Sequence, residues 1–130
     1  MATILDGKKL TMGTCYYPEH WPESMWKEDL RRMLETGIEV IRIAEFAWNL
    51  TEPEEGVFTF DFFDRFLDLC DELGILIVDE LYDKWNDQYV GAGRKHFSEL
   101  WMQQLAEFIQ RDRNHPSVVM WSMGNELQSY

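Results

Sequence analysis

Short apolar runs alternate along the chain with longer segments in which apolar residues recur at helical spacing. Four of the runs have the length and continuity of buried strands: 10–16, 39–44, 75–78 and 118–122. Three helices are expected between them, with predicted N-caps at Ser24, Asp61 and Ser98. Gly37 and Gly74 follow the first two helical patterns, where a glycine commonly ends a helix. The chain therefore reads as four strands alternating with three helices.

The order of these elements defines a fold class. Strands that alternate with helices and are apolar on both faces indicate a parallel sheet with right-handed crossovers. Successive strands start about 30–40 residues apart, close to the length of one unit in an eight-fold β/α barrel of roughly 250 residues. A chain of 130 residues has room for four such units. We expect an α/β fold that is half of a TIM barrel, with four parallel strands and three intervening helices, forming one partial domain over residues 1–130.

The excess of acidic residues disfavours some classes of binding partner. The chain has 24 acidic and 12 basic residues and a formal net charge of −12. Such a surface repels nucleic acid and anionic lipid, and it suits an uncharged ligand better. No run approaches the ~18 apolar residues that a membrane span needs. The first ten residues lack the apolar core of a secretory signal, so a cytoplasmic location is expected.

Cysteine and histidine usage gives no sign of a metal centre. Cys15 and Cys70 both fall in apolar patterns, so we expect two buried free thiols. The three histidines, His20, His96 and His115, show no ligand spacing with one another or with cysteine. Neither a metal ion nor another cofactor is predicted.

Glu126 is the first candidate for chemistry. It follows the strand predicted at 118–122, and the carboxyl ends of parallel strands are where ligands sit in α/β folds. Apolar surroundings at a strand end would raise the pKa of this carboxyl and suit it to general acid/base work. The pattern alone leaves an alternative open, in which 124–126 is a turn and the glutamate only favours a helix N-terminus.

Arg42 is the one charged residue inside an otherwise apolar strand segment, 40–44. An arginine in such a place most often pairs with a carboxylate, and Glu45 or Asp79 could be the partner. In a carbohydrate site the same arginine would orient a carboxylate and keep it ionised.

Acidic and aromatic residues gather at the predicted strand ends. The acids are Glu45, Asp79, Glu80 and Asp83, and each one alone could be a solvated loop charge or a helix cap. The aromatic residues expected on the same side are Tyr16, Tyr17, Trp21, Trp48 and Trp85. Together they suggest a sugar-binding site at this end of the barrel. The acids would accept hydrogen bonds from sugar hydroxyls, and the aromatic rings would stack on the pyranose. The polar run 111–115 falls at the opposite mouth, where polar residues usually serve stability.

Two parts of the chain resemble two related families of enzymes. Residues 11–75 resemble the family 42 glycoside hydrolases, which are β-galactosidases, through the strings GTCYYPEHWP, IRIAEFAW and EPEEGVF. Residues 76–127 resemble the catalytic domain of family 2, which contains β-galactosidases and β-glucuronidases, through VDELYDKW and RDRNHPSVVMWSMGNE. Both families share the eight-fold barrel. The chain thus looks like a mosaic, and natural recombination, engineering and computational generation all stay open as its origin.

The resemblance implies roles for particular residues. It places Glu126 at the acid/base position, Asn125 beside the sugar 2-hydroxyl and Arg42 near the nucleophile, with Glu45, Trp48 and Tyr16 as further substrate-binding candidates. The nucleophile of these families is a glutamate on strand seven, which has no counterpart in the predicted elements. Hydrolysis would then need a complementary half-barrel chain. The alternative is a non-catalytic half-barrel that self-associates as a homodimer or only binds carbohydrate.

Overall fold

Four parallel strands form a single sheet in the order in which they occur along the chain. The computed structural model describes residues 10–54, 56–80 and 97–123. The strands are β1 (Met12–Cys15), β2 (Ile38–Ile43), β3 (Leu76–Glu80) and β4 (Val118–Ser122), and each pairs in parallel with the next. The predicted parallel α/β architecture is confirmed, and the last strand has the bounds that the sequence pattern indicated.

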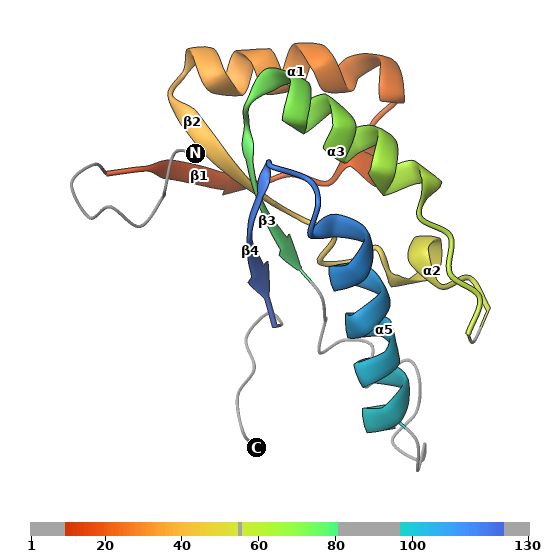
Figure 1. The fold of residues 1–130 in the computed structure, drawn as a ribbon. Coiled ribbons are helices and arrows are strands. Elements are labelled where there is room, and N and C mark those ends of the chain that lie inside the picture. Colours follow the sequence, from red (N-terminus) through yellow and green to blue (C-terminus); the bar gives the residue numbers. More distant parts are fainter. Residues whose placement is uncertain (1–9, 55, 81–96, 124–130) are drawn as a thin grey trace.

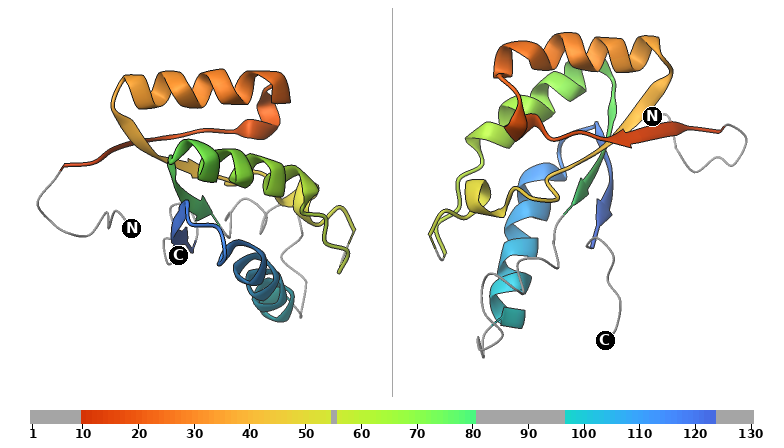
Figure 2. Two further views of the ribbon diagram at one scale, coloured as in Figure 1. Left: turned by 45° about the horizontal axis from the view of Figure 1, so that its top comes forward. Right: turned by 180° about the vertical axis from the view of Figure 1, so that it is seen from behind.

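Long helices connect the strands. They are α1 (Glu23–Glu35), α3 (Asp61–Leu73) and α5 (Phe97–Asp112), and they lie on one side of the curved sheet (Figures 1 and 2). Two short helical segments, η1 (Pro18–His20) and α2 (Trp48–Thr51), occur in the loops after β1 and β2 and were not expected from the sequence. A strand followed by a helix on the same side, repeated in order, is the construction of a TIM barrel, here over four strands.

The helix ends agree with the sequence in part. Gly37 and Gly74 have φ values of 88° and 75°, the left-handed conformation that ends a helix and favours glycine. Two predicted N-caps are wrong by one or two positions. Pro22 precedes α1, which begins at Glu23, and Phe60 precedes α3, which begins at Asp61. Neither residue offers a side-chain cap, so each helix begins with an acidic residue whose charge complements the helix dipole.

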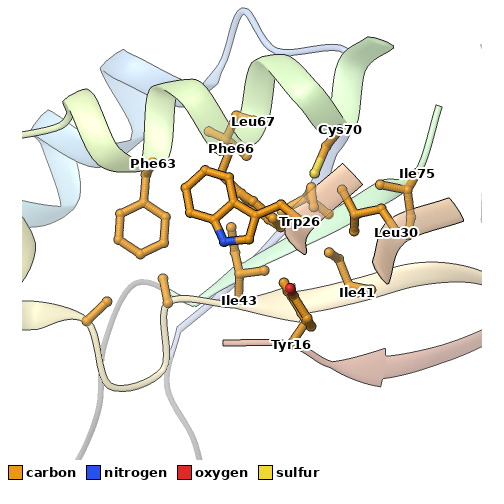
Figure 3. Close-up of a cluster of buried hydrophobic side chains, with 13 residues drawn as sticks. Tyr16, Trp26, Leu30, Ile41, Ile43, Phe63, Phe66, Leu67, Cys70 and Ile75 are labelled. Carbon is orange, nitrogen blue, oxygen red and sulfur yellow. The ribbon is translucent and has the colours of Figure 1, made fainter. Parts of the chain in front are cut away.

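The main core lies between the sheet and the helices α1 and α3 (Figure 3). Ile41 and Ile43 of β2 and Ile77 of β3 face these helices and are fully buried. From α1, Trp26 packs edge-on against Phe66 of α3, with ring centroids 5.1 Å apart. Burying large aromatic and aliphatic side chains stabilises each by about 1.5–3 kcal/mol. This layer therefore fixes the positions of α1, α3 and the two central strands.

The two cysteines differ in environment. Cys70 is buried in α3 as expected, whereas Cys15, at the end of the edge strand β1, is exposed. The expectation of two buried thiols is wrong for Cys15. Its side chain alternates with that of Tyr16 and lies on the face of β1 that no helix covers.

Candidate active site

Arg42 and Glu45 form an ion pair where β2 ends. Arg42 Nη2 lies 2.6 Å from Glu45 Oε2, and the Glu45 side chain is 5% exposed. Residues three apart in an extended strand point to opposite faces. Ala44 has φ 68°, a left-handed conformation that is uncommon for a residue other than glycine. This turn of the backbone brings Glu45 to the face of Arg42 and confirms one of the two expected partners.

Tyr17 completes the contact at Glu45. Its hydroxyl donates a hydrogen bond to Glu45 Oε2 at 2.9 Å. Burial, together with this bond to an anion, raises the pKa of Tyr17 to about 12. The tyrosine ring stacks between His20 and Phe46, with centroids 5.3 Å and 5.6 Å away. Sequence analysis placed Tyr17 at this mouth but as a stacking ring, and its hydrogen bond to Glu45 depends on loop geometry that the sequence does not specify.

A second carboxylate approaches the same guanidinium from the neighbouring strand. Glu80, at the end of β3, is buried, and its Oε2 lies 3.8 Å from Arg42 Nη1. Burial works against the charge of Arg42, but the acidic neighbours, of which Glu45 is the strongest, more than offset it and raise the pKa of the guanidinium. The result is a cation that stays charged between two acids at the carboxyl end of the sheet.

Tyr16 and Asp79 point away from this cluster. The Tyr16 ring is 6% exposed and stacks on Phe66 in the main core, and its hydroxyl donates to Asp29 Oδ2 at 2.9 Å. Burial and the Asp29 carboxylate raise the pKa of this tyrosine. Its ring lies on the helix side of the sheet rather than with Arg42. Asp79 is opposite Ile43 in the β2–β3 pair and is likewise on the helix side, so it is not the partner of Arg42.

Several predicted site residues lie outside the described part of the chain. These are Glu126, Asn125, Asp83 and Trp85. Trp48 is the first residue of α2, and its side chain is also outside the description. The described residues thus bring together Arg42, Glu45, Tyr17 and Glu80 at the carboxyl ends of β2 and β3, the end toward which β4 also runs.

A separate hollow of about 570 Å³ lies between β1 and α1. Trp21, Met25 and Met33 line it, and Tyr17 forms part of its wall. The hollow follows the edge of β1 that carries no partner strand among the described residues. It is therefore beside the ion-pair cluster rather than part of it.

Two groups of acid and histidine side chains lie close enough to hold a metal ion, Asp64 with Asp112 and His115, and Asp68 with Asp71 and His115. Both are on the helix side of the sheet. His115 Nδ1 is 2.7 Å from Asp71 Oδ2, and the Arg111 guanidinium contacts Asp112. His115 and Asp112, one in both groups and the other in the first, are thus already engaged with protein partners.

No helix in the described residues is long and apolar enough to cross a bilayer.

Two family models match the chain and overlap in its middle. The model of glycosyl hydrolase family 42, described as beta-galactosidase, matches residues 15–78. The model of the TIM barrel domain of glycosyl hydrolases family 2 matches residues 62–130. The order of the two matches confirms the resemblance inferred from the sequence, including the change from one family to the other near β3.

Individual relatives extend along most of the chain. A putative beta-glucuronidase of Formosa agariphila is 36% identical over 96% of this chain and 12% of its own length. The beta-galactosidase Bga of Halorubrum lacusprofundi is 29% identical over 91% of this chain and 20% of its own length. The crystal structure of a beta-galactosidase from Marinomonas ef1 superposes with a TM-score of 0.78 and 28% identity over 91% of this chain and 22% of that chain.

This chain thus spans about a fifth or less of these relatives. The parallel sheet, its helices and the polar cluster at the strand ends agree with a partial barrel. With a family model that matches more than half of the residues, the chain belongs to the TIM-barrel glycoside hydrolases of family 2 and continues, at its N-terminal end, into sequence of the related family 42.

Proposed function

We propose that this chain supplies the first four β/α units of a retaining β-galactosidase. The observation that carries the proposal is the similarity to β-galactosidases along 91% of the chain, in sequence and in structure. The Arg42–Glu45–Glu80 cluster supports it, because charged groups at the carboxyl ends of barrel strands are where such enzymes bind their substrates.

In this proposal Glu126 is the general acid/base. As an acid it protonates the glycosidic oxygen as the bond to the sugar breaks, and as a base it later takes a proton from the water that attacks the glycosyl-enzyme. Asn125 donates to the 2-hydroxyl of the sugar. Both residues come directly after β4 along the chain, at the strand end where ligands bind in parallel α/β folds.

Arg42 and Glu45 have a supporting role at the floor of the site. Arg42 is 29% exposed, and its guanidinium lies against Glu45 and Glu80. Because a fixed guanidinium stabilises a neighbouring anion, we assign Arg42 to orient the nucleophilic carboxylate, with Glu45 fixing its position. Trp48, at the start of α2 beyond β2, is proposed as a wall of the sugar site.

The nucleophile would come from further β/α units. A retaining glycosidase needs two carboxyl groups about 5–5.5 Å apart on facing strands. The described strands are neighbours in one sheet, so none of them faces β4 across a closed barrel. We therefore propose that hydrolysis requires the remaining strands, as part of a longer protein or as a complementary chain.

An aryl β-galactoside assay tests this. The chain is assayed alone and after co-expression with strands five to eight of a related β-galactosidase. We expect turnover only in the combined sample and its loss in Glu126→Gln. Glu35→Gln, which changes an exposed glutamate of α1, serves as the matched control and keeps full activity. Equal rates for Glu126→Gln and the parent would remove the assigned role.

A second candidate is a non-catalytic half-barrel that self-associates or binds carbohydrate only. It is favoured by β1, whose four residues are all exposed, and by the hollow along its edge. An uncovered edge of a sheet is a template for pairing with another strand. Light scattering on the purified chain tests the self-association, since a homodimer would double the mass and a dispersed monomer would contradict self-association.

A further inference from the structure

Two carboxyl groups are sealed between the sheet and α5. Asp79 lies in β3 and Asp112 is the last residue of α5, and both are 0% exposed. They are on the helix side of the sheet, away from the cluster at Arg42. Charged carboxylates are almost never fully buried unless a positive charge or hydrogen-bond donors compensate them.

One guanidinium lies against this pair. Arg111 contacts Asp112, and its Nη2 is 3.8 Å from Asp79 Oδ2. Its Nε is also 3.8 Å from Asp64 Oδ1 of α3. The Arg111 side chain is 7% exposed and packs over the rings of Phe60 and Phe108, 4.7 Å and 4.9 Å from their centroids. In the described part of the chain, the single positive charge of Arg111 therefore lies against two buried acids and a third that is partly exposed.

Among the described residues, the other groups around Asp79 supply no second cation. His115, in the turn after α5, is 2.7 Å from Asp71 and is engaged there. Glu80, the next residue of β3, adds a further negative charge. Trp121, opposite Asp79 in β4, leaves its indole Nε1 without an acceptor in the described structure, so it does not donate to this carboxyl.

The hydrogen bonds around Asp79, like the charges, do not compensate an ionised carboxylate at this position. Neither oxygen of Asp79 has a donor within hydrogen-bond distance among the described residues. Two ionised carboxylates cannot bond to each other because both are acceptors only, whereas a protonated carboxyl is a donor. A proton on Asp79 would let this carboxyl donate a hydrogen bond and would reduce the excess negative charge.

We propose that Asp79 carries a proton at neutral pH and donates it in a hydrogen bond to Asp112, and that this pair of side chains, held against Arg111, fastens α5 to the sheet in a pH-dependent manner. Burial raises the pKa of Asp79 well above its ordinary value, and the hydrogen bond and the charge of Asp112 raise it further. The inference concerns the fold of the chain and is independent of the proposed hydrolysis.

The described apolar contacts of α5 lie apart from the main core. Leu105 and Phe108 pack with Phe60 and Trp121 in a cluster separate from the main core. Figure 1 shows α5 descending away from the layer formed by α1 and α3. Arg111 and Asp112 thus connect the end of α5 to Asp79 of β3, directly before the turn that leads into β4.

The direction of the pH effect follows from the raised pKa. A carboxyl that binds its proton more tightly when folded contributes its full stability below the ordinary pKa of unfolded aspartate. That contribution is lost as the pH rises through the higher pKa of the folded chain. Between the two values, folding takes up a proton, and the unfolding equilibrium constant rises up to about tenfold per pH unit from this pair alone.

Asp79→Asn tests the proposal, since asparagine keeps the shape and the donor of a protonated acid but cannot titrate. Urea unfolding is measured at a series of pH values from 5 to 8 for the parent, Asp79→Asn and Glu35→Gln, which changes an exposed acid of α1. We expect the ratio of parent to Asp79→Asn unfolding constants to rise with pH, by up to about tenfold per unit. The ratio of parent to Glu35→Gln unfolding constants should stay flat. Parallel curves for the parent and Asp79→Asn would overturn the proposal.

Infrared spectroscopy on the unmodified chain provides a readout that does not depend on the variant folding. A protonated Asp79 predicts the C=O stretch of a protonated carboxyl at neutral pH. We expect the band in the parent and in Glu35→Gln and its loss in any folded Asp79→Asn chain. A folded parent without this band at neutral pH would overturn the proposal.

Discussion

Arg42 Nη2 and Glu45 Oε2 are 2.6 Å apart although a strand ends between the two residues. The contact depends on the left-handed backbone at Ala44, which turns Glu45 back to the side of Arg42. Tyr17, from the loop after β1, bonds to the same oxygen of Glu45. The pair therefore ties the loop after β1 to the end of β2, at the place where we locate the floor of the site.

Removal of the Glu45 carboxylate should destabilise the chain. Glu45→Ala leaves the Tyr17 hydroxyl without its acceptor and Arg42 with the more distant Glu80, so we expect a loss of about 2–3 kcal/mol. Glu45→Gln keeps an oxygen for both donors and should cost less. Urea unfolding at neutral pH measures both variants. An Ala variant as stable as the parent would show that the pair carries no net stability.

The backbone at Ala44 makes a second prediction. A β-branched residue is strongly disfavoured at φ 68°, and this position is 8% exposed, so Ala44→Val should cost about 2 kcal/mol or more. Ala44→Gly relieves the strain but adds freedom to the unfolded chain, and it should stay within about 1 kcal/mol of the parent. Thermal unfolding compares the two. Equal losses for Val and Gly would contradict a left-handed conformation at this position.

The two thiols should differ in reactivity. Burial raises the pKa of Cys70, and its side chain is 0% exposed, so both thiolate formation and access are suppressed. Cys15 is exposed. We expect a disulfide reagent to modify one thiol rapidly in the native chain and the second only after unfolding. Cys15→Ser should abolish the fast reaction, whereas a fast reaction that persists in this variant would place Cys70 at the surface.

The sequence was sufficient for the order of strands and helices because its signals are local. Continuous apolar runs marked β2, β3 and β4, and glycines at 37 and 74 marked two helix ends, since the left-handed turns there need glycine. A charged residue inside an apolar strand was enough to predict that Arg42 pairs with an acid. Each of these features depends on a few consecutive residues.

The sequence did not predict on which face of the sheet individual side chains lie. Residues next to each other in a strand point to opposite faces, and which face carries Tyr16 depends on the register of β1 against β2. In the structure Cys15 is paired with Arg42, which leaves Tyr16 on the helix side. Asp79 is on that side for the same reason in β3. Glu45 reaches Arg42 only through the unusual backbone at Ala44, and nothing in the sequence marks that alanine.

The most direct test of the role of Glu126 compares the hydrolysis rates of Glu126→Gln on substrates with poor and good leaving groups. The measurement uses the chain completed with strands five to eight. Without the acid, Glu126→Gln should slow the hydrolysis of an alkyl β-galactoside by about 10²–10⁴-fold, because a poor leaving group needs a proton. A dinitrophenyl β-galactoside, whose leaving group departs unprotonated, should form the glycosyl-enzyme at nearly the parent rate, and added azide should restore turnover. An equal loss of glycosyl-enzyme formation with both substrates, without rescue by azide, would contradict Glu126 as the acid/base.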